Sequence, residues 1–416
     1  MEKHDTVIIG GGQAGLATSH HLGLFGHEHV VFERARVAER WRTQRWDSLM
    51  FQFPNWSIEL PGRSYTSADP NGFAHRDEVL RFIEDYCAWI KAPIRTGVNV
   101  SALRSKSSGG RFEIVTDVGS VSARNVVIAT GPYQRSQRPP CHRRLPADVA
   151  QIDASDYRNP EALPDGAVLV VGSGASGCQI ADELLESGRR VYLSIGRHRR
   201  VPRRYRGHDA FWWRREQGEL DQTVDTTPAI RRMPAPLVTG VHGGYDIDLR
   251  RSAANGMILL GHLLDTRGST IAFALDVEAS LRAGDQTFRE FKSAVDAFLQ
   301  TTDLDAQTPP SEGVHAFKSE PIEGLDRLDT KADRIAAVIW ATGYELDFGW
   351  VELPVFDSHG VPTQYRGATA VPGAYFVGLP WMHKAKSSFL YGVGEDAGYI
   401  GSRIADDQNR SVKRRR

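Results

Sequence analysis

The chain has few cysteines and no cysteine pair of the redox-active kind. Its three cysteines among 416 residues, Cys87, Cys141 and Cys178, are odd in number and far apart, and no Cys-x-x-C occurs. We therefore expect reduced thiols and a cytoplasmic location rather than a disulfide framework. The missing Cys-x-x-C also disfavours an enzyme that exchanges thiols and disulfides.

Net charge and long apolar runs are lacking too. Fifty-one basic residues balance fifty-one acidic ones, so no broad field attracts nucleic acid or an anionic membrane. No apolar run approaches the roughly 20 residues of a membrane span, and Val7–Ile9 lacks the basic flank of a signal peptide. With 41% hydrophobic residues, the chain is long enough for two cores. Small-molecule chemistry is the function class that remains.

What the chain does have is one pattern twice, an apolar strand that runs into Gly-x-Gly-x-x-Gly. The glycines are Gly10, Gly12 and Gly15 after residues 6–9, and Gly172, Gly174 and Gly177 after residues 168–171. A helical pattern (16–24 and 180–186) and a second strand (29–32 and 191–195) follow each loop. Two βαβ units with parallel sheets are predicted.

A second repeat, a strand ending in Ala-Thr-Gly, closes each unit. Its residues are Ala129, Thr130 and Gly131, and Ala341, Thr342 and Gly343. We predict an α/β fold of two Rossmann-type dinucleotide-binding domains, with the second domain (160–330) inserted between the two segments of the first (1–155 and 331–416). An insertion at about 205–310, with a helical pattern at 287–299 and an irregular loop at Pro228–Pro236, is expected to cap the cleft.

The two loops differ in the chemistry that follows them. Glycine lets a pyrophosphate approach the N–H groups at a helix N-terminus. Glu33 stands where an acid grips a ribose diol, although a solvated carboxylate is the alternative. The second unit lacks this acid and carries Arg197 and Arg199, which favour a 2′-phosphate and hence NADPH over NADH. A basic surface turn is the alternative there.

These motifs resemble the flavin-containing monooxygenases, a family that includes the plant YUCCA enzymes, Baeyer–Villiger monooxygenases and bacterial flavoproteins linked by name to cation transport. The resemblance covers nearly the whole chain. Besides the glycine loops it is carried by Trp41-Arg42, residues 45–49, Pro54-Asn55-Trp56, the run ATGPY from Ala129, PRRYRG from Pro202, and SSFLYGVGEDA from Ser387.

The resemblance implies that NADPH reduces FAD, that O2 then gives a C4a-(hydro)peroxyflavin, and that the oxygen goes to a nitrogen, a sulfur or a carbonyl of a small organic substrate. It implies an FAD set of Gly10, Gly12, Gln13, Ala14, Gly15, Glu33, Arg34, Trp41, Arg42, Trp46 and Val100. Ala129, Thr130 and Gly131 line the domain junction, and Gly378, Ser387, Ser388 and Leu390 face the flavin ring. The NADPH set is Gly172, Gly174, Ala175, Ser176, Gly177, Arg197, Arg199, Thr342 and Gly343.

Asn55 is the candidate catalytic residue, because relatives place an asparagine beside the flavin and a carboxamide both donates and accepts hydrogen bonds. A Pro-Asn turn is the alternative. The family fingerprint F-x-G-x-x-x-H-x-x-x-(F/Y) would fall on Ala147, Val149, Asp153 and Tyr157, and only the tyrosine matches. The aromatic residues Trp56, Phe211, Trp212, Trp213 and Trp381 line a substrate cavity or belong to the core.

Two other functions stay open, an NADPH:acceptor reductase or oxidase without oxygen insertion, and a flavin-bearing redox sensor or transport regulator. Neither the substrate nor the oligomeric state is fixed by the sequence, and a homodimer is one possible assembly. No metal site is expected, because the histidines and cysteines lack metal-ligand spacing.

Overall fold

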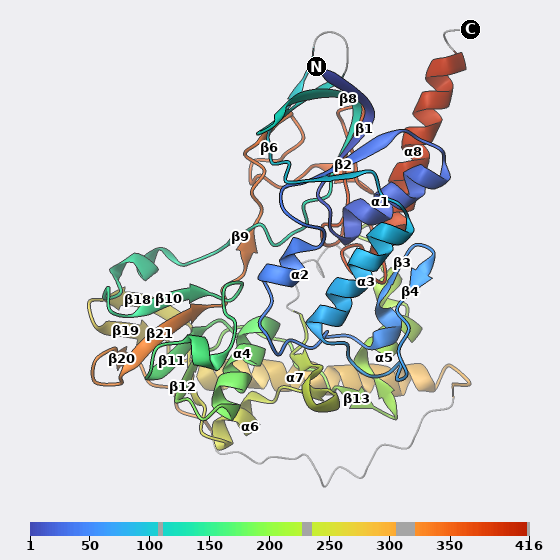
Figure 1. Cartoon of the computed structure of the whole chain (residues 1–416). Helices are drawn as coiled ribbons and strands as arrows, with labels where there is room; N and C mark the ends of the chain where they lie inside the picture. Colours follow the sequence, from blue (N-terminus) through green and yellow to red (C-terminus); the bar gives the residue numbers. More distant parts are fainter. Residues whose placement is uncertain (107–110, 227–234, 305–320, 414–416) are drawn as a thin grey trace.

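The computed structural model describes residues 1–106, 111–226, 235–304 and 321–413, and the side chains up to 407. Its strands form two large sheets, one in the upper and one in the lower part of Figure 1. The predicted mixed α/β fold with two parallel-strand units is confirmed by these sheets. In the described residues, no helix combines the length and the apolar character needed to cross a membrane.

The first sheet is built on parallel pairs of β1 (Glu2–Ile9) with β2 (His29–Glu33) and β8 (Gly119–Ile128). Its remaining strands are β5 (Ile94–Thr96), β6 (Val100–Ser105), β7 (Phe112–Thr116), β23 (Val351–Glu352), β24 (Gln364–Tyr365), β25 (Ala368–Thr369) and β26 (Ala374–Phe376). Both faces are covered, because Ile8 packs into one hydrophobic cluster while Val7 and Ile9 pack into another. This explains the continuous apolar run that precedes Gly10.

Three helices pack on one face of this sheet: α1 (Gln13–Leu24), α3 (Arg76–Trp89) and α8 (Val393–Lys413). The short helix α2 (Glu39–Thr43) and the strands β3 (Glu59–Leu60) and β4 (Arg63–Ser64) lie in the same segment of the chain. The last helix, α8, lies along α1 (Figure 1), and its glycines permit a close approach, since a Cβ on Gly398 would lie 3.2 Å from the His21 ring. The two ends of the chain thus meet in one core.

The second sheet consists of five parallel strands in the order β10-β21-β11-β12-β17. They are β10 (Ala150–Asp153), β21 (Ile335–Trp340), β11 (Ala167–Val171), β12 (Val191–Ser194) and β17 (Ile258–Leu260). Helix α4 (Ala175–Glu186) packs on one face, and the antiparallel strands β18 (Leu263–Arg267), β19 (Thr270–Phe273) and β20 (Arg327–Asp329) contribute to the cluster on the other.

The expected domain boundaries at 155 and 331 are wrong by one strand each. Strand β10 precedes the first boundary and β21 follows the second, yet both pair within the second sheet. Strand β21 lies between β10 and β11 and pairs with both. Such pairing depends on partners that are remote in sequence, so the local pattern did not indicate it. The chain crosses between the sheets through β9 (Arg135–Ser136) and β22 (Tyr344–Glu345), which pair with each other.

The insertion carries α5 (Ala210–Glu216), α6 (Leu249–Ala254) and the long helix α7 (Val277–Leu299), with the short strands β13 (Arg204–Tyr205), β14 (His208–Asp209), β15 (Val238–Thr239) and β16 (Tyr245–Asp246). The helix predicted at 287–299 is the second half of α7. Its first half packs on the second sheet, while Phe291 and Val295 in its second half pack around Trp213 of α5. Most of the irregular loop predicted at 228–236, and the end of the insertion, lie outside the described residues.

Candidate nucleotide-binding and active site

The first glycine loop brings strand and helix into direct contact. Gly10 has φ +115°, and a Cβ there would lie 2.6 Å from the carbonyl oxygen of Ala129. A Cβ on Gly15 would lie 1.9 Å from the carbonyl oxygen of Gly10. Gly12 is the N-cap of α1 and has nothing within 4 Å of its Cβ position. The helix N-terminus is therefore open to an anion.

Glu33 lies beside this loop with its carboxylate already oriented. It accepts hydrogen bonds from the Gly11 N–H at 2.7 Å and from the Ala35 N–H at 3.0 Å. Arg34, its neighbour, is exposed. Val98 donates its N–H to the Glu33 carbonyl at 3.0 Å, whereas Val100 begins the next strand.

The second loop repeats this geometry. Gly172 has φ +113°, and a Cβ there would lie 2.4 Å from the carbonyl oxygen of Ala341. A Cβ on Gly177 would lie 2.0 Å from the carbonyl oxygen of Gly172. Gly174 is the N-cap of α4, whose first turn carries the predicted Ala175 and Ser176. The residue equivalent to Glu33 is Ile195, which is fully buried. Hence this loop has no carboxylate at the strand end.

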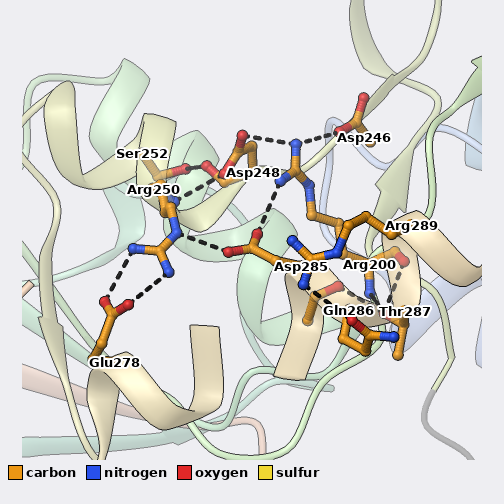
Figure 2. A network of polar contacts seen from close by, with 11 residues as sticks. Arg200, Asp246, Asp248, Arg250, Ser252, Glu278, Asp285, Gln286, Thr287 and Arg289 are labelled. Atoms are coloured by element: carbon orange, nitrogen blue, oxygen red, sulfur yellow. Dashed lines mark hydrogen bonds and ion pairs between the residues drawn. The ribbon is translucent and has the colours of Figure 1, made fainter. Parts of the chain in front are cut away.

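The segment after β12 sends its basic side chains to different places. Arg197 is exposed, Arg199 is half-buried, and His198 is buried against Gly284 of α7. Arg200 is anchored most firmly: its N–H and C=O both bond to the Thr287 hydroxyl at 2.9 Å. Its guanidinium contacts Asp246, Asp248 and Asp285, as Figure 2 shows.

The network in Figure 2 continues through Arg250. This side chain donates to both carboxylate oxygens of Glu278 at 3.0 Å and to Asp285 at 3.0 Å. The hydrogen bond from Arg250 lowers the pKa of Glu278 to about 2. The network therefore holds the loop after β12 against α6 and α7. The positive charge of Arg200 is compensated by aspartates of the same chain.

The segment predicted to face the flavin ring does meet the first glycine loop. Gln13 donates its amide to the Ser388 carbonyl at 2.7 Å. Gly378 has φ +88°, and a Cβ there would lie 2.4 Å from the Ala14 side chain. Ser387 accepts N–H bonds from His383 and Lys384, and Leu390 is buried in the same core as Ala14.

The residues at the junction divide between the two units. Trp41 packs against both cores, while Trp46 lies in the core of the second sheet. Arg42 pairs with Glu84 of α3. Gln134, which sequence reasoning missed, donates to the Thr130 hydroxyl at 3.1 Å and to the Gly131 carbonyl at 2.8 Å. On the return crossing, the Thr342 hydroxyl donates to the Gln137 carbonyl, and Gly343 accepts the Gln137 N–H.

Asn55 begins the short 3-10 helix η1 (Asn55–Ser57) and is buried. Its Nδ2 donates to the Ser67 hydroxyl at 3.1 Å and to the Asp69 carbonyl at 2.9 Å. Its Oδ1 is buried with no hydrogen-bond partner. The residue therefore makes the predicted turn and also keeps one acceptor unused, which is costly unless a ligand supplies a donor.

Five aromatic rings form a cluster where the two units meet. Phe53 stacks on Phe211 at 4.2 Å and lies 5.3 Å from Phe389, and Phe211 reaches Trp56 at 5.5 Å and Tyr391 at 6.2 Å. The sequence analysis did not identify Phe53 or Phe389 as site residues. Phe53 stands two positions before Asn55, and Phe389 directly follows Ser388. The alternative of a core role holds for Trp213, which is fully buried.

The fingerprint position that lacks histidine makes an ion pair. Asp153, at the end of β10, accepts from the Arg138 Nε at 2.6 Å, so it ties the crossing segment to the second sheet. Tyr157 donates its hydroxyl to Glu183 of α4 at 2.8 Å. Burial raises the pKa of Glu183, with the neighbouring acids adding to it. The crossing thus has its own polar anchors in place of the histidine.

Comparison with known proteins agrees with this geometry. A family model described as pyridine nucleotide-disulphide oxidoreductase matches residues 7–207. A Geobacillus kaustophilus protein named uncharacterized oxidoreductase CzcO-like is 31% identical over 402 residues, which are 95% of this chain and 97% of that one. The probable indole-3-pyruvate monooxygenase YUCCA1 of Arabidopsis thaliana is 28% identical over 195 residues, covering 46% of this chain and 47% of its own.

A solved structure, the flavin-containing monooxygenase from Stenotrophomonas maltophilia, superposes with a TM-score of 0.66 at 20% identity, and the match covers 98% of this chain and 99% of that one. At this identity the superposition supports the two-sheet fold. The Geobacillus relative spans nearly the whole chain at 31% identity, which is enough to assign a family. The chain is thus an oxidoreductase that belongs to the CzcO-like family.

Proposed function

We propose that the protein is an FAD- and NADPH-dependent monooxygenase that acts on a small organic substrate. One NADPH, one O2, one proton and one substrate molecule give NADP⁺, water and a substrate with one added oxygen atom. The observation that carries the proposal is the pair of glycine loops, which are alike in backbone but unequal in charge. Glu33 follows the first loop, and Ile195 with Arg197 follows the second.

The first loop fits FAD. The Glu33 carboxylate, held by two N–H groups, would bind a ribose diol. The open N-terminus of α1 at Gly12 would hold the pyrophosphate. Gln13, joined to Ser388, and Gly378 against Ala14 would border the ring end of the flavin. Bound FAD would accept a hydride from NADPH and react with O2.

The second loop fits NADPH. Gly174 opens the N-terminus of α4 to a pyrophosphate, and no carboxylate stands at the strand end to repel a 2′-phosphate. Arg197 is exposed beside that position and would form charge-assisted hydrogen bonds with the phosphate. Because Arg200 is neutralised by three aspartates, selection of the phosphorylated cofactor would depend on Arg197.

Asn55 would act on the oxygen chemistry through its unused Oδ1. That atom would accept a hydrogen bond, while the Nδ2 contacts hold the amide in place. We expect Asn55→Asp to divert reducing equivalents to H2O2, because the variant keeps the size and an acceptor but loses the two Nδ2 hydrogen bonds that orient the side chain. The nitrogen, sulfur or carbonyl nature of the substrate is open, and the name of the YUCCA relative, an indole-3-pyruvate monooxygenase, places a 2-oxo acid on the first panel to try.

The test is to incubate the purified holoenzyme with NADPH under ¹⁸O2 and panels of amines, sulfides, ketones and 2-oxo acids. NADPH consumption in excess of H2O2, with one ¹⁸O in the product, would support the proposal. Equal amounts of NADPH and H2O2 with every substrate would contradict it. Faster anaerobic turnover with a quinone acceptor would indicate a reductase, and failure of NADPH to bleach the flavin would indicate a sensor.

A further inference from the structure

The insertion pairs with the segment that would border the flavin. This flavin-facing segment comprises residues 383–390, directly before α8. Thr223 of the insertion lies opposite Lys384 in an isolated antiparallel bridge. On either side of the bridge, Val224 donates its N–H to the His383 carbonyl at 2.9 Å, and Ala385 donates its N–H to the Gln222 carbonyl at 3.0 Å. The insertion therefore holds the backbone of the flavin-facing segment.

Two lysines of the flavin-facing segment share two carboxylates. The ammonium groups of Lys384 and Lys386 lie 2.7 and 3.0 Å from the same oxygen, Oδ1 of Asp221, which ends the 3-10 helix η4 (Glu219–Asp221) of the insertion. They also lie 2.8 and 2.5 Å from the two carboxylate oxygens of Glu395 in the first turn of α8. Two positive and two negative groups thus tie the insertion to α8.

The burial of Lys386 makes this arrangement sensitive to Asp221. The side chain of Lys386 is 9% exposed, against 25% for Lys384. Burial by itself would lower the pKa of Lys386, but Glu395 and Asp221 outweigh it and the pKa is raised. A buried ammonium group is stable when carboxylates compensate it. Without Asp221, both lysines would share Glu395 and repel each other, so the pairing with the insertion would loosen.

The flavin-facing segment transmits such a change to the first glycine loop. Ser388, two positions after Lys386, accepts the amide of Gln13 at 2.7 Å. The turn that follows is tight, because a Cβ on Gly392 would lie 2.3 Å from the Lys386 carbonyl oxygen. A short and constrained stretch of chain therefore connects Asp221 of the insertion with the helix N-terminus that would hold FAD.

We propose that Asp221 is a positioning residue for hydride transfer from NADPH to FAD: through Lys384 and Lys386 it aligns the flavin-facing segment with the NADPH-binding unit. This inference rests on the proposed function, in which the hydride carries two electrons to the flavin and leaves NADP⁺. Loss of the Asp221 carboxylate would slow this transfer. It would leave the binding of NADPH intact, because the second glycine loop and Arg197 are unchanged.

The first experiment measures anaerobic reduction of the flavin by NADPH in a stopped-flow instrument. In Asp221→Asn we expect the limiting rate to fall at least about fivefold, which corresponds to about 1 kcal/mol on the barrier, while the Kd for NADPH stays within twofold. Asp326→Asn is the matched control, because Asp326 is 54% exposed, against 48% for Asp221, and pairs with the neighbouring Arg327. Its rate should equal that of the wild type. Flavin content and the melting temperature report whether each variant is folded.

A disulfide between the paired strands should rescue the variant. Gln222→Cys and Ala385→Cys, added to Asp221→Asn, place two thiols on opposite residues of an antiparallel pair. The Cα atoms of such a pair are about 4.5–5.5 Å apart, within the range that a disulfide spans. The native cysteines, Cys87, Cys141 and Cys178, are buried. We expect the reduced form to be as slow as Asp221→Asn, and the oxidised form to recover to within twofold of the wild-type rate.

Hydrogen exchange followed by mass spectrometry gives a readout that requires no turnover. In Asp221→Asn, the amides of residues 383–388 should exchange at least threefold faster than in the wild type. Oxidation of the disulfide variant should slow them again, and Asp326→Asn should leave them unchanged. A role of Asp221 confined to η4 would leave the exchange of this segment at its wild-type rate.

Three outcomes would overturn the assignment. A wild-type rate of flavin reduction in Asp221→Asn would show that the ion pairs do not align the two units. A slow rate that the oxidised disulfide leaves unchanged would show that Asp221 acts in another way. A rise in the Kd for NADPH that accounts for the lost rate would assign Asp221 to cofactor binding. If NADPH does not reduce the wild-type flavin, the proposed function fails, and unchanged hydrogen exchange in Asp221→Asn would then overturn the positioning role as well.

Discussion

The two glycines of the second loop should fail in different ways when each is replaced by alanine. In Gly177→Ala, the new Cβ would lie 2.0 Å from the Gly172 carbonyl oxygen, whereas ordinary contact begins at 3.4 Å. Helix α4 must therefore move away from β11, and no side-chain rotation relieves the overlap, because the neighbour is backbone. In Gly174→Ala, nothing lies within 4 Å of the new atom.

The magnitudes follow from opposing terms. Alanine gains about 1 kcal/mol over glycine inside a helix, while overpacking against a rigid neighbour costs up to about 3 kcal/mol. We expect Gly177→Ala to lose about 2 kcal/mol of unfolding free energy, which corresponds to a drop in Tm of roughly 4–8 °C for a unit of this size. Gly174→Ala should keep the wild-type Tm but weaken NADPH binding at least tenfold, since the N-cap must admit the pyrophosphate.

The assays are differential scanning calorimetry of the flavin-bound protein without NADP⁺ and titration of NADPH under anaerobic conditions. A wild-type Tm for Gly177→Ala would refute the steric argument. An equal loss of Tm in both variants would show that the loop as a whole, rather than the helix contact, sets the stability. Normal NADPH affinity in Gly174→Ala would refute the phosphate site.

Three further predictions concern the surroundings of the site. Thr287→Val removes the hydroxyl that holds the N–H and C=O of Arg200; it should cost about 1–3 kcal/mol in urea unfolding and raise the KM for NADPH, while Thr287→Ser stays near wild type. Because Arg250 lowers the folded pKa of Glu278 from 4.5 to about 2, this stabilisation is present above about pH 4.5 and disappears as the pH falls towards 2. The Tm of the wild type should thus fall more steeply over that range than the Tm of Arg250→Gln, and parallel curves would contradict this. Cys178, whose pKa is raised by burial, should resist Ellman's reagent at pH 8 until the protein is unfolded; immediate labelling would contradict its burial.

Sequence reasoning located the features that are local in the chain. The glycine loops and Glu33 are defined by spacing within one βαβ unit, so their geometry follows from about thirty consecutive residues. The repeated Ala-Thr-Gly indicated the strand that closes each unit, and the structure adds that Ala129 and Ala341 lie directly against the first glycine of each loop. Gln13 and Ser388 meet as the family resemblance implied, although they are separated by 375 positions.

Features that depend on remote partners were not predictable in the same way. The assignment of β10 and β21 to the second sheet depends on pairing across nearly two hundred positions of chain. Arg199 and Arg200 are the same residue type, yet Arg200 forms ion pairs with three aspartates of the insertion, whereas Arg199 forms no ion pair with an aspartate among the residues that the structure describes. Asn55 is a similar case, since only the packing around η1 reveals that its Oδ1 has no partner.

The paired crossing strands have a consequence for how such a chain can be cut and rejoined. Ser136 on β9 lies opposite Tyr344 on β22, and the Cα atoms of an antiparallel pair are about 4.5–5.5 Å apart. Since consecutive Cα atoms are about 3.8 Å apart, one or two residues suffice to reconnect the first unit after excision of the second. The second unit therefore begins and ends at adjacent positions of the first unit. Each unit can thus be expressed separately as a test of whether it folds alone.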